Sequence, residues 1–132
     1  MKELKPIDKI YLEDYDVYVN PYLTYAQIQQ ISNAMSLDWK WAEAQVNLDM
    51  LVLYHATNLS KEDIEGIEHD LLFSSGLIEA VYKSIRNIDQ LKDALDYKQS
   101  FARGMTQLMK NLPNMVKPLK EAVDKHERSS KK

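Results

Sequence analysis

The sequence contains no cysteine, and its 132 residues include only three glycines and four prolines. Without cysteine the chain has no disulfide, thiolate metal site or thiol nucleophile, which fits a reducing compartment. So little glycine and proline is unlike a disordered or fibrous chain. The glycines, at positions 66, 76 and 104, lie too far apart to form a phosphate-binding loop. Nucleotide hydrolysis is therefore not expected.

Long hydrophobic runs are also absent. The longest, "MLVLY" at 50–54, is far too short to span a bilayer. The first ten residues, "MKELKPIDKI", have no apolar core that could serve as a signal peptide. We therefore expect a soluble, cytoplasmic protein with no membrane partner.

The length and composition suit one compact core, since 45% of the residues are hydrophobic. We expect a single helical domain over 1–127, with an N-terminal arm at 1–23 and a basic disordered tail at 128–132. Residues 117–132 carry six basic and three acidic side chains, so the preceding residues hold a net charge of −6. Such an acidic body would repel duplex nucleic acid, which makes nucleic acid an unexpected partner.

The N-terminal arm allows two interpretations. "KIYL" and "DVYV" alternate apolar with polar residues and could form a small β-hairpin around "EDYD", but an irregular arm is equally compatible. Pro21 disfavours helix at Asn20, and Thr24 can then cap a helix over 25–35. The arm should end where this capped helix begins.

The rest of the chain predicts a mainly α fold, a compact bundle of five to six helices. Ser36 or Asp38 can cap a helix over 39–56, whose apolar residues form two stripes that predict burial between neighbours. Ser60 with Asp63 predicts the start of an acidic helix over 61–73, followed by a short helix over 77–85. The predicted inward residues are Trp41, Ala44, Leu48, Leu51 and His55, then Val46, Met50 and Leu53, then Ile64, Ile67 and Leu71, and finally Leu77, Val81 and Ile85.

The longest predicted helix covers 88–112, from a cap formed by Asn87 with Gln90 to a stop at Pro113. Its apolar residues follow the spacing of a heptad seam. Such a seam requires a partner helix, which can come from this chain or from a second copy. Lys98 interrupts the seam, and we expect it at the rim of a helix–helix contact, with Phe101, Met105 and Met109 partly available to a partner. The apolar seam positions are Ile88, Leu91, Leu95, Ala102, Met105, Met109 and Leu112.

No group of residues predicts catalysis, a metal site or a cofactor. Glu65, Glu68 and His69 lie within one turn but lack the paired histidines of a hydrolytic zinc helix. "SSG" at 74–76 follows a predicted helix, whereas a nucleophile elbow follows a strand. We expect no enzyme.

Aromatic residues provide the stronger indication. Five of the eight tyrosines fall in the first 25 residues, at 11, 15, 18, 22 and 25. Tyrosine and tryptophan are enriched at interfaces because they combine contact area with a polar group. We therefore predict a protein-binding surface that includes Tyr15, Tyr18, Tyr22, Tyr25 and Trp39.

Three stretches, "YVNPYLTYAQIQQI", "NLDMLVLYHATNLS" and "SGLIEAVYKSIRNIDQL", resemble a type of small helical protein encoded by tailed phages of Gram-positive hosts. In that type, an Asn-Pro-Tyr-Leu segment precedes a helix, a central helix rich in methionine and leucine follows, and Ser-Gly-Leu opens the next. The resemblance carries no catalytic residue. It implies virion morphogenesis in the host cytoplasm, as a tail-assembly chaperone or connector component that binds a phage structural subunit.

Two alternatives remain open. The "YKSIRN" segment, with Lys83 and Arg86, is the nearest match to a DNA-recognition helix, although it holds few basic side chains. An acidic segment could instead occupy the basic groove of a host defence nucleic-acid enzyme and inhibit it. Its carboxylates are Glu62, Asp63, Glu65, Glu68 and Asp70.

Overall fold

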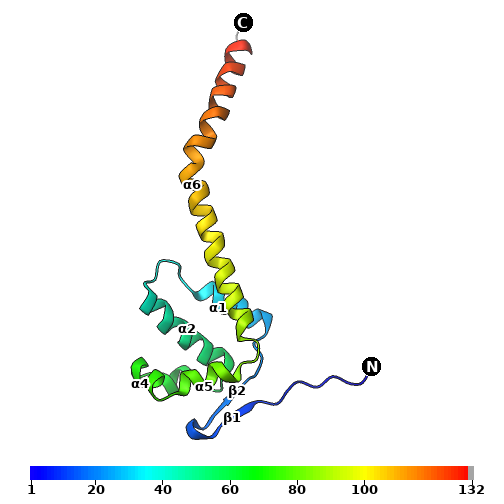
Figure 1. The fold of residues 1–132 in the computed structure, drawn as a ribbon, viewed down its shortest axis with the longest axis vertical. Helices are drawn as coiled ribbons and strands as arrows, with labels where there is room; N and C mark the ends of the chain where they lie inside the picture. The colour runs from blue at the N-terminus through cyan, green and yellow to red at the C-terminus, as the bar shows by residue number, and fades with distance from the viewer. Residues whose placement is uncertain (131–132) are drawn as a thin grey trace. The chain divides into compact units, whose positions relative to one another are not determined.

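A computed structural model describes residues 1–130, with side chains described as far as Lys110. The chain divides into two compact units, Met1–Leu95 (unit 1) and Asp96–Lys132 (unit 2). The predicted mainly α fold is confirmed, and a small two-stranded hairpin lies near its N-terminus (Figure 1). The single domain proposed for 1–127 stays a prediction. Of the tail expected to be disordered, 128–132, the backbone of 128–130 is helical, and residues 131–132 lie outside the described residues.

The N-terminal arm is a β-hairpin that contributes directly to the core. Strands β1 (Ile10–Leu12) and β2 (Val17–Val19) pair antiparallel around a single turn of 3-10 helix, Glu13–Tyr15. Because side chains alternate along a strand, Val17 and Val19 face inward and are 2% and 0% exposed, while Tyr18 faces outward. Of the two interpretations of this arm, the hairpin is the observed one.

The helix after the hairpin starts as its sequence predicts. Helix α1 (Tyr25–Ala34) has Thr24 at its N-cap. The Thr24 hydroxyl accepts from the backbone N–H of Gln27, and the Gln27 side chain accepts from the backbone N–H of Thr24. This capping box satisfies two N–H groups that the helix leaves unpaired.

Helix α2 (Trp41–Ala56) differs from its prediction in two ways. It starts two residues later, at an N-cap, Lys40, that forms no side-chain cap bond, so neither predicted cap is used. Of the two predicted stripes only Leu53 is fully buried, and Trp41 is 81% exposed. The helix is covered from one side, where α1 and α5 (Leu77–Ser84) contact it. Its buried face consists of Asp49, Val52, Leu53 and Ala56.

The predicted acidic helix is divided in two. Ser60 and Asp63 form the predicted capping box, but α3 covers only Lys61–Ile64 and α4 covers His69–Ser74. Between them Gly66 adopts a φ of +92°, a left-handed conformation that ends the helix. Because α4 begins separately at His69, the face that it buries differs from the predicted one. Leu72 is buried, and Leu71, which was predicted to face inward, is exposed. Ile67, also predicted to face inward, is exposed.

A glycine corner connects α4 to α5. Gly76 has a φ of +87°, and a Cβ atom at this position would lie 2.9 Å from the hydroxyl oxygen of Tyr15. That hydroxyl donates to the Ser75 carbonyl at 2.7 Å, which ties the hairpin to the corner. The "SSG" segment therefore has a structural role here.

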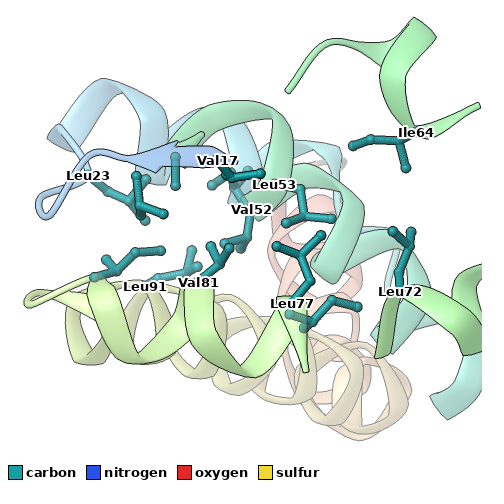
Figure 2. Packing of buried hydrophobic residues seen from close by; sticks show 14 of the residues in the cluster. Val17, Leu23, Val52, Leu53, Ile64, Leu72, Leu77, Val81 and Leu91 are labelled. Atoms are coloured by element: carbon teal, nitrogen blue, oxygen red, sulfur yellow. The ribbon is translucent and has the colours of Figure 1, made fainter. Parts of the chain in front are cut away.

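The core lies within unit 1, where strand β2, helices α2 and α5 and the first turn of α6 (Ile88–Ser130) meet (Figure 2). Leu77, Val81 and Ile85 are buried as predicted. Asn87 contacts Gln90, and its side-chain amide also exchanges two hydrogen bonds with the backbone of Leu23. It therefore anchors the hairpin side of the core to the start of α6.

Helix α6 is longer than predicted. The expected stop at Pro113 is wrong, because the helical backbone continues through Pro113 and Pro118 to Ser130. Proline removes one helical hydrogen bond and favours a kink, but it does not necessarily end a helix.

Candidate functional site

A buried carboxylate is the most unusual polar feature of unit 1. Asp49 is 1% exposed and is the one charged side chain that is fully buried among the described residues. One of its oxygens, Oδ1, accepts from the Tyr82 hydroxyl at 2.7 Å and from Nε2 of Gln45 at 3.0 Å. The other, Oδ2, lies 3.0 Å from Nε2 of His69. Three partners compensate for the loss of water around the carboxylate.

This network connects three helices, since Asp49 and Gln45 belong to α2, His69 to α4 and Tyr82 to α5. Burial, the hydrogen bond to Asp49 and the Asp49 charge raise the pKa of Tyr82 above its ordinary value. The phenol therefore stays protonated near neutral pH and acts as a hydrogen-bond donor. His69 differs from the exposed carboxylates near it in the sequence, because its ring is 21% exposed and contacts the buried Asp49 carboxylate.

An open groove of about 510 Å³ lies beside this network, between α2, α5 and the first two turns of α6. Tyr82 and Gln45 form its polar wall and hold Asp49 behind them. Lys83 and Lys92 also line the groove, and their ammonium groups pair with Glu79 at 2.8 Å and Asp89 at 4.0 Å. The remaining lining is aliphatic and consists of Leu48, Ile85, Ile88, Leu91 and Leu95.

Sequence analysis missed both the network and the groove. The available indication was Asp49 itself, a carboxylate three residues before Val52, four before Leu53 and seven before Ala56, on what proves to be the buried helical face. The first three residues of the predicted seam, Ile88, Leu91 and Leu95, line the groove of unit 1.

The N-terminal tyrosines differ in their surroundings. Tyr15 is half-buried and bonded to Ser75, so it supports the fold. Tyr18 stacks against Tyr11 with ring centroids 4.7 Å apart, and both are 45% exposed. Tyr22 and Tyr25 are also exposed. Of the two tryptophans, the predicted Trp39 is half-buried and Trp41 is exposed.

Helix α6 within unit 2 carries exposed apolar side chains. Phe101, Met105 and Met109, all predicted to contact a partner, are 61%, 43% and 66% exposed. Leu108 belongs to the same row, because spacings of three and four residues share one helical face. Lys98 is half-buried. We call Phe101, Met105, Leu108 and Met109 the α6 row.

The charged segments of the alternative hypotheses lie on the surface of unit 1. All five carboxylates of the acidic segment are exposed, and Asp63 has a lowered pKa because the backbone N–H and hydroxyl of Ser60 donate to it. Lys83 pairs with Glu79 at 2.8 Å, and Arg86 is exposed. Within the part of the chain where side chains are described, no group of three His, Asp or Glu could hold a metal ion.

Comparisons of this chain with protein-family models, curated proteins and solved structures found no match. No helix in the described range combines the length and apolar character needed to cross a membrane.

Proposed function

We propose that this protein is a non-enzymatic module that binds another protein through the α6 row. The observation that carries the proposal is the exposure of four large apolar side chains at consecutive helical spacings. Burying a side chain of this size fully contributes about 1.5–3 kcal/mol. Because each is 43–66% exposed, a partner would gain roughly half of that per residue, about 3–6 kcal/mol for the four, so polar or charged contacts must add to the row to offset association costs of about 4–15 kcal/mol.

The charge of unit 2 indicates what kind of segment fits. Residues 96–132 carry nine of the 17 basic and four of the 20 acidic side chains, a net charge of +5, whereas residues 1–95 carry −8. An apolar segment flanked by carboxylates complements such a helix. Methionine side chains adapt to several partner shapes, which suits transient binding.

The most specific form of this proposal is a phage tail-assembly chaperone. It would cover an apolar segment of a tail or head subunit until assembly and then release it. This form rests on the sequence resemblance to small helical proteins of tailed phages.

A second candidate is an inhibitor of a host defence nucleic-acid enzyme. It is favoured by the exposure of Glu62, Asp63, Glu65, Glu68 and Asp70, which could occupy a basic groove in place of nucleic acid.

The test is to purify the full-length chain and measure its binding to tail and head subunits from the same genome by calorimetry. We expect Met105→Glu with Met109→Glu to weaken binding at least tenfold, because two carboxylates would have to be desolvated. The matched control is Ser100→Glu with Gln107→Glu, which adds the same charge at two other exposed positions of α6.

Circular dichroism should show that both double variants remain folded. Equal binding by the two variants would overturn the role of the α6 row. If the wild type binds none of these subunits but inhibits a nuclease, the second candidate replaces the first.

A further inference from the structure

Strand β2 has hydrogen-bond partners on both of its edges. Strand β1 pairs with one edge, and residues 56–58, at the end of α2, cover the other. There the Tyr18 N–H donates to the side-chain oxygen of Asn58 at 2.9 Å, and the Asn58 N–H donates to the Tyr18 carbonyl at 3.2 Å. The Asn20 N–H donates to the Ala56 carbonyl at 2.7 Å. In the described part of the chain no group bonds to the backbone along the outer edge of β1, which is therefore the open edge of the hairpin.

The bonds of β2 also determine which backbone groups of β1 face the open edge. Because the N–H and C=O of Tyr18 point towards Asn58, they point away from Tyr11, the residue opposite. Tyr11 and Tyr18 are thus a non-hydrogen-bonded pair, in which side chains approach closely, and their ring centroids are 4.7 Å apart. Each residue of such a pair directs its backbone groups outwards. The N–H and C=O of Tyr11 therefore face the open edge, whereas those of Ile10 and Leu12 face β2.

The sequence around Tyr11 is complementary to itself in an antiparallel arrangement. When Tyr11 lies opposite Tyr11 of a second strand β1, Ile10 lies opposite Leu12 and Lys9 lies opposite Glu13. Residues opposite each other share one face of a sheet, so the half-buried Ile10 and Leu12 meet on the core side and the tyrosines meet on the outer side. Lys9 and Glu13 are exposed and opposite in charge, and they meet twice, once at each end of the paired segment.

Neighbouring registers lack this complementarity. With the strands centred on Ile10, the carboxylate of Asp8 would lie opposite Leu12. With the strands centred on Leu12, Ile10 would lie opposite Asp14. Each of these registers places an apolar side chain against an acidic one, which disfavours it.

We propose that two copies of this chain join their β1 strands antiparallel about a twofold axis at Tyr11. The two hairpins then form one four-stranded sheet in the order β2–β1–β1–β2, and the two Tyr11 residues exchange their N–H···O=C bonds. The outer face carries a row of four tyrosines, Tyr18–Tyr11–Tyr11–Tyr18. The same edge of both copies is used, so the dimer closes and leaves no open edge. This contact lies in unit 1 and does not depend on the partner proposed for the α6 row.

The paired segment is short, which limits the affinity. It ends at Glu13, whose carbonyl accepts from the Asp16 N–H within the 3-10 turn at 3.4 Å. Beyond this residue the chain turns towards β2, so Asp14 does not continue the ladder opposite Asp8. Only residues 9–13 of each copy can therefore pair. We expect a dissociation constant on the order of 100 µM.

Sedimentation equilibrium of the full-length protein tests the charge complementarity. Lys9→Glu and Glu13→Lys should each weaken dimerisation at least fivefold, because each turns both flanking ion pairs into like-charge contacts. An equimolar mixture of the two variants should dimerise as the wild type does, since the heterodimer pairs acid with base at both ends. The matched control is Lys5→Glu, which makes the same charge change at an exposed position outside the paired segment and should remain dimeric.

Amide hydrogen exchange followed by NMR tests the strand pairing itself. The Tyr11 amide faces water in a single copy and is bonded in the dimer, so its exchange should slow as the protein is concentrated. The Ile10 and Leu12 amides face β2 in both states, and their exchange should not depend on concentration. These two residues are therefore an internal control for the stability of the hairpin.

Four results would overturn the proposal. The first is a wild type that stays monomeric at about 1 mM, roughly ten times the expected dissociation constant. The second is a rate of Tyr11 amide exchange that does not change with concentration, and the third is a mixture of Lys9→Glu with Glu13→Lys that associates no better than either variant alone. The fourth is a dimer that Met105→Glu with Met109→Glu abolishes, since that contact would belong to the α6 row.

Discussion

Replacing Asp49 by Ala gives a direct test of the buried network. The carboxylate is 1% exposed and accepts from Tyr82 and Gln45 while contacting His69. Alanine removes all three interactions together and leaves a small void on the buried face of α2. The three former partners then differ in how easily they regain hydrogen bonds from water.

The size of the effect follows from that difference. Gln45 is exposed and the His69 ring is 21% exposed, so water can solvate both. Tyr82 is half-buried on the groove wall, and its unpaired hydroxyl costs about 1–3 kcal/mol. The void adds about 1 kcal/mol. The expected loss of roughly 2–4 kcal/mol is a large part of the 5–15 kcal/mol typical of a small domain.

Urea unfolding followed by tryptophan fluorescence and circular dichroism measures this loss. The control is Asp49→Asn, which keeps the shape and one acceptor oxygen for Tyr82 and should lose about half as much. The exposed Asp93 serves as a second control, since its replacement by Ala removes a surface carboxylate and should leave the midpoint unchanged. The reasoning is refuted if Asp49→Ala costs under about 1 kcal/mol, or if Asn and Ala are equally destabilising.

Three further predictions concern unit 1. In the unfolded chain Tyr82 ionises near its ordinary pKa of 10.0, whereas the folded protein holds its pKa higher, so its contribution to stability is complete below about pH 10 and is lost as pH rises further. The melting temperature should fall above pH 10, and Tyr82→Phe should reduce that fall. Gly76→Ala should cost roughly 1–3 kcal/mol in urea unfolding, because φ is +87° and the new Cβ meets the Tyr15 hydroxyl; adding Tyr15→Phe should cost less than the sum of the single changes. A chain truncated after Leu95 should unfold cooperatively with a dispersed amide NMR spectrum, because the buried hydrophobic residues of the described part end at Leu91; a molten fragment would contradict this.

The sequence by itself determined the features that depend on residues four or fewer apart. The cap at Thr24 and the pairing of Ser60 with Asp63 are as predicted, since each involves residues no more than three apart, although the part played by Gln27 in the Thr24 cap was not predicted. The inward face of α5 is also correct, because one helical period specifies it. The exposure of Met105 and Met109 is consistent with the predicted partner surface, although their role stays a prediction.

The tertiary structure alone decided which side of α2 is buried and what lies behind the groove. Periodicity showed two apolar stripes on α2, but the neighbouring helices cover a face that contains Asp49 and only one stripe residue, Leu53. His69 is 20 residues from Asp49 and Tyr82 is 33 residues away, so no local pattern indicates that they meet. Burial of a carboxylate is favourable only when distant donors converge on it, and that convergence depends on how the helices pack.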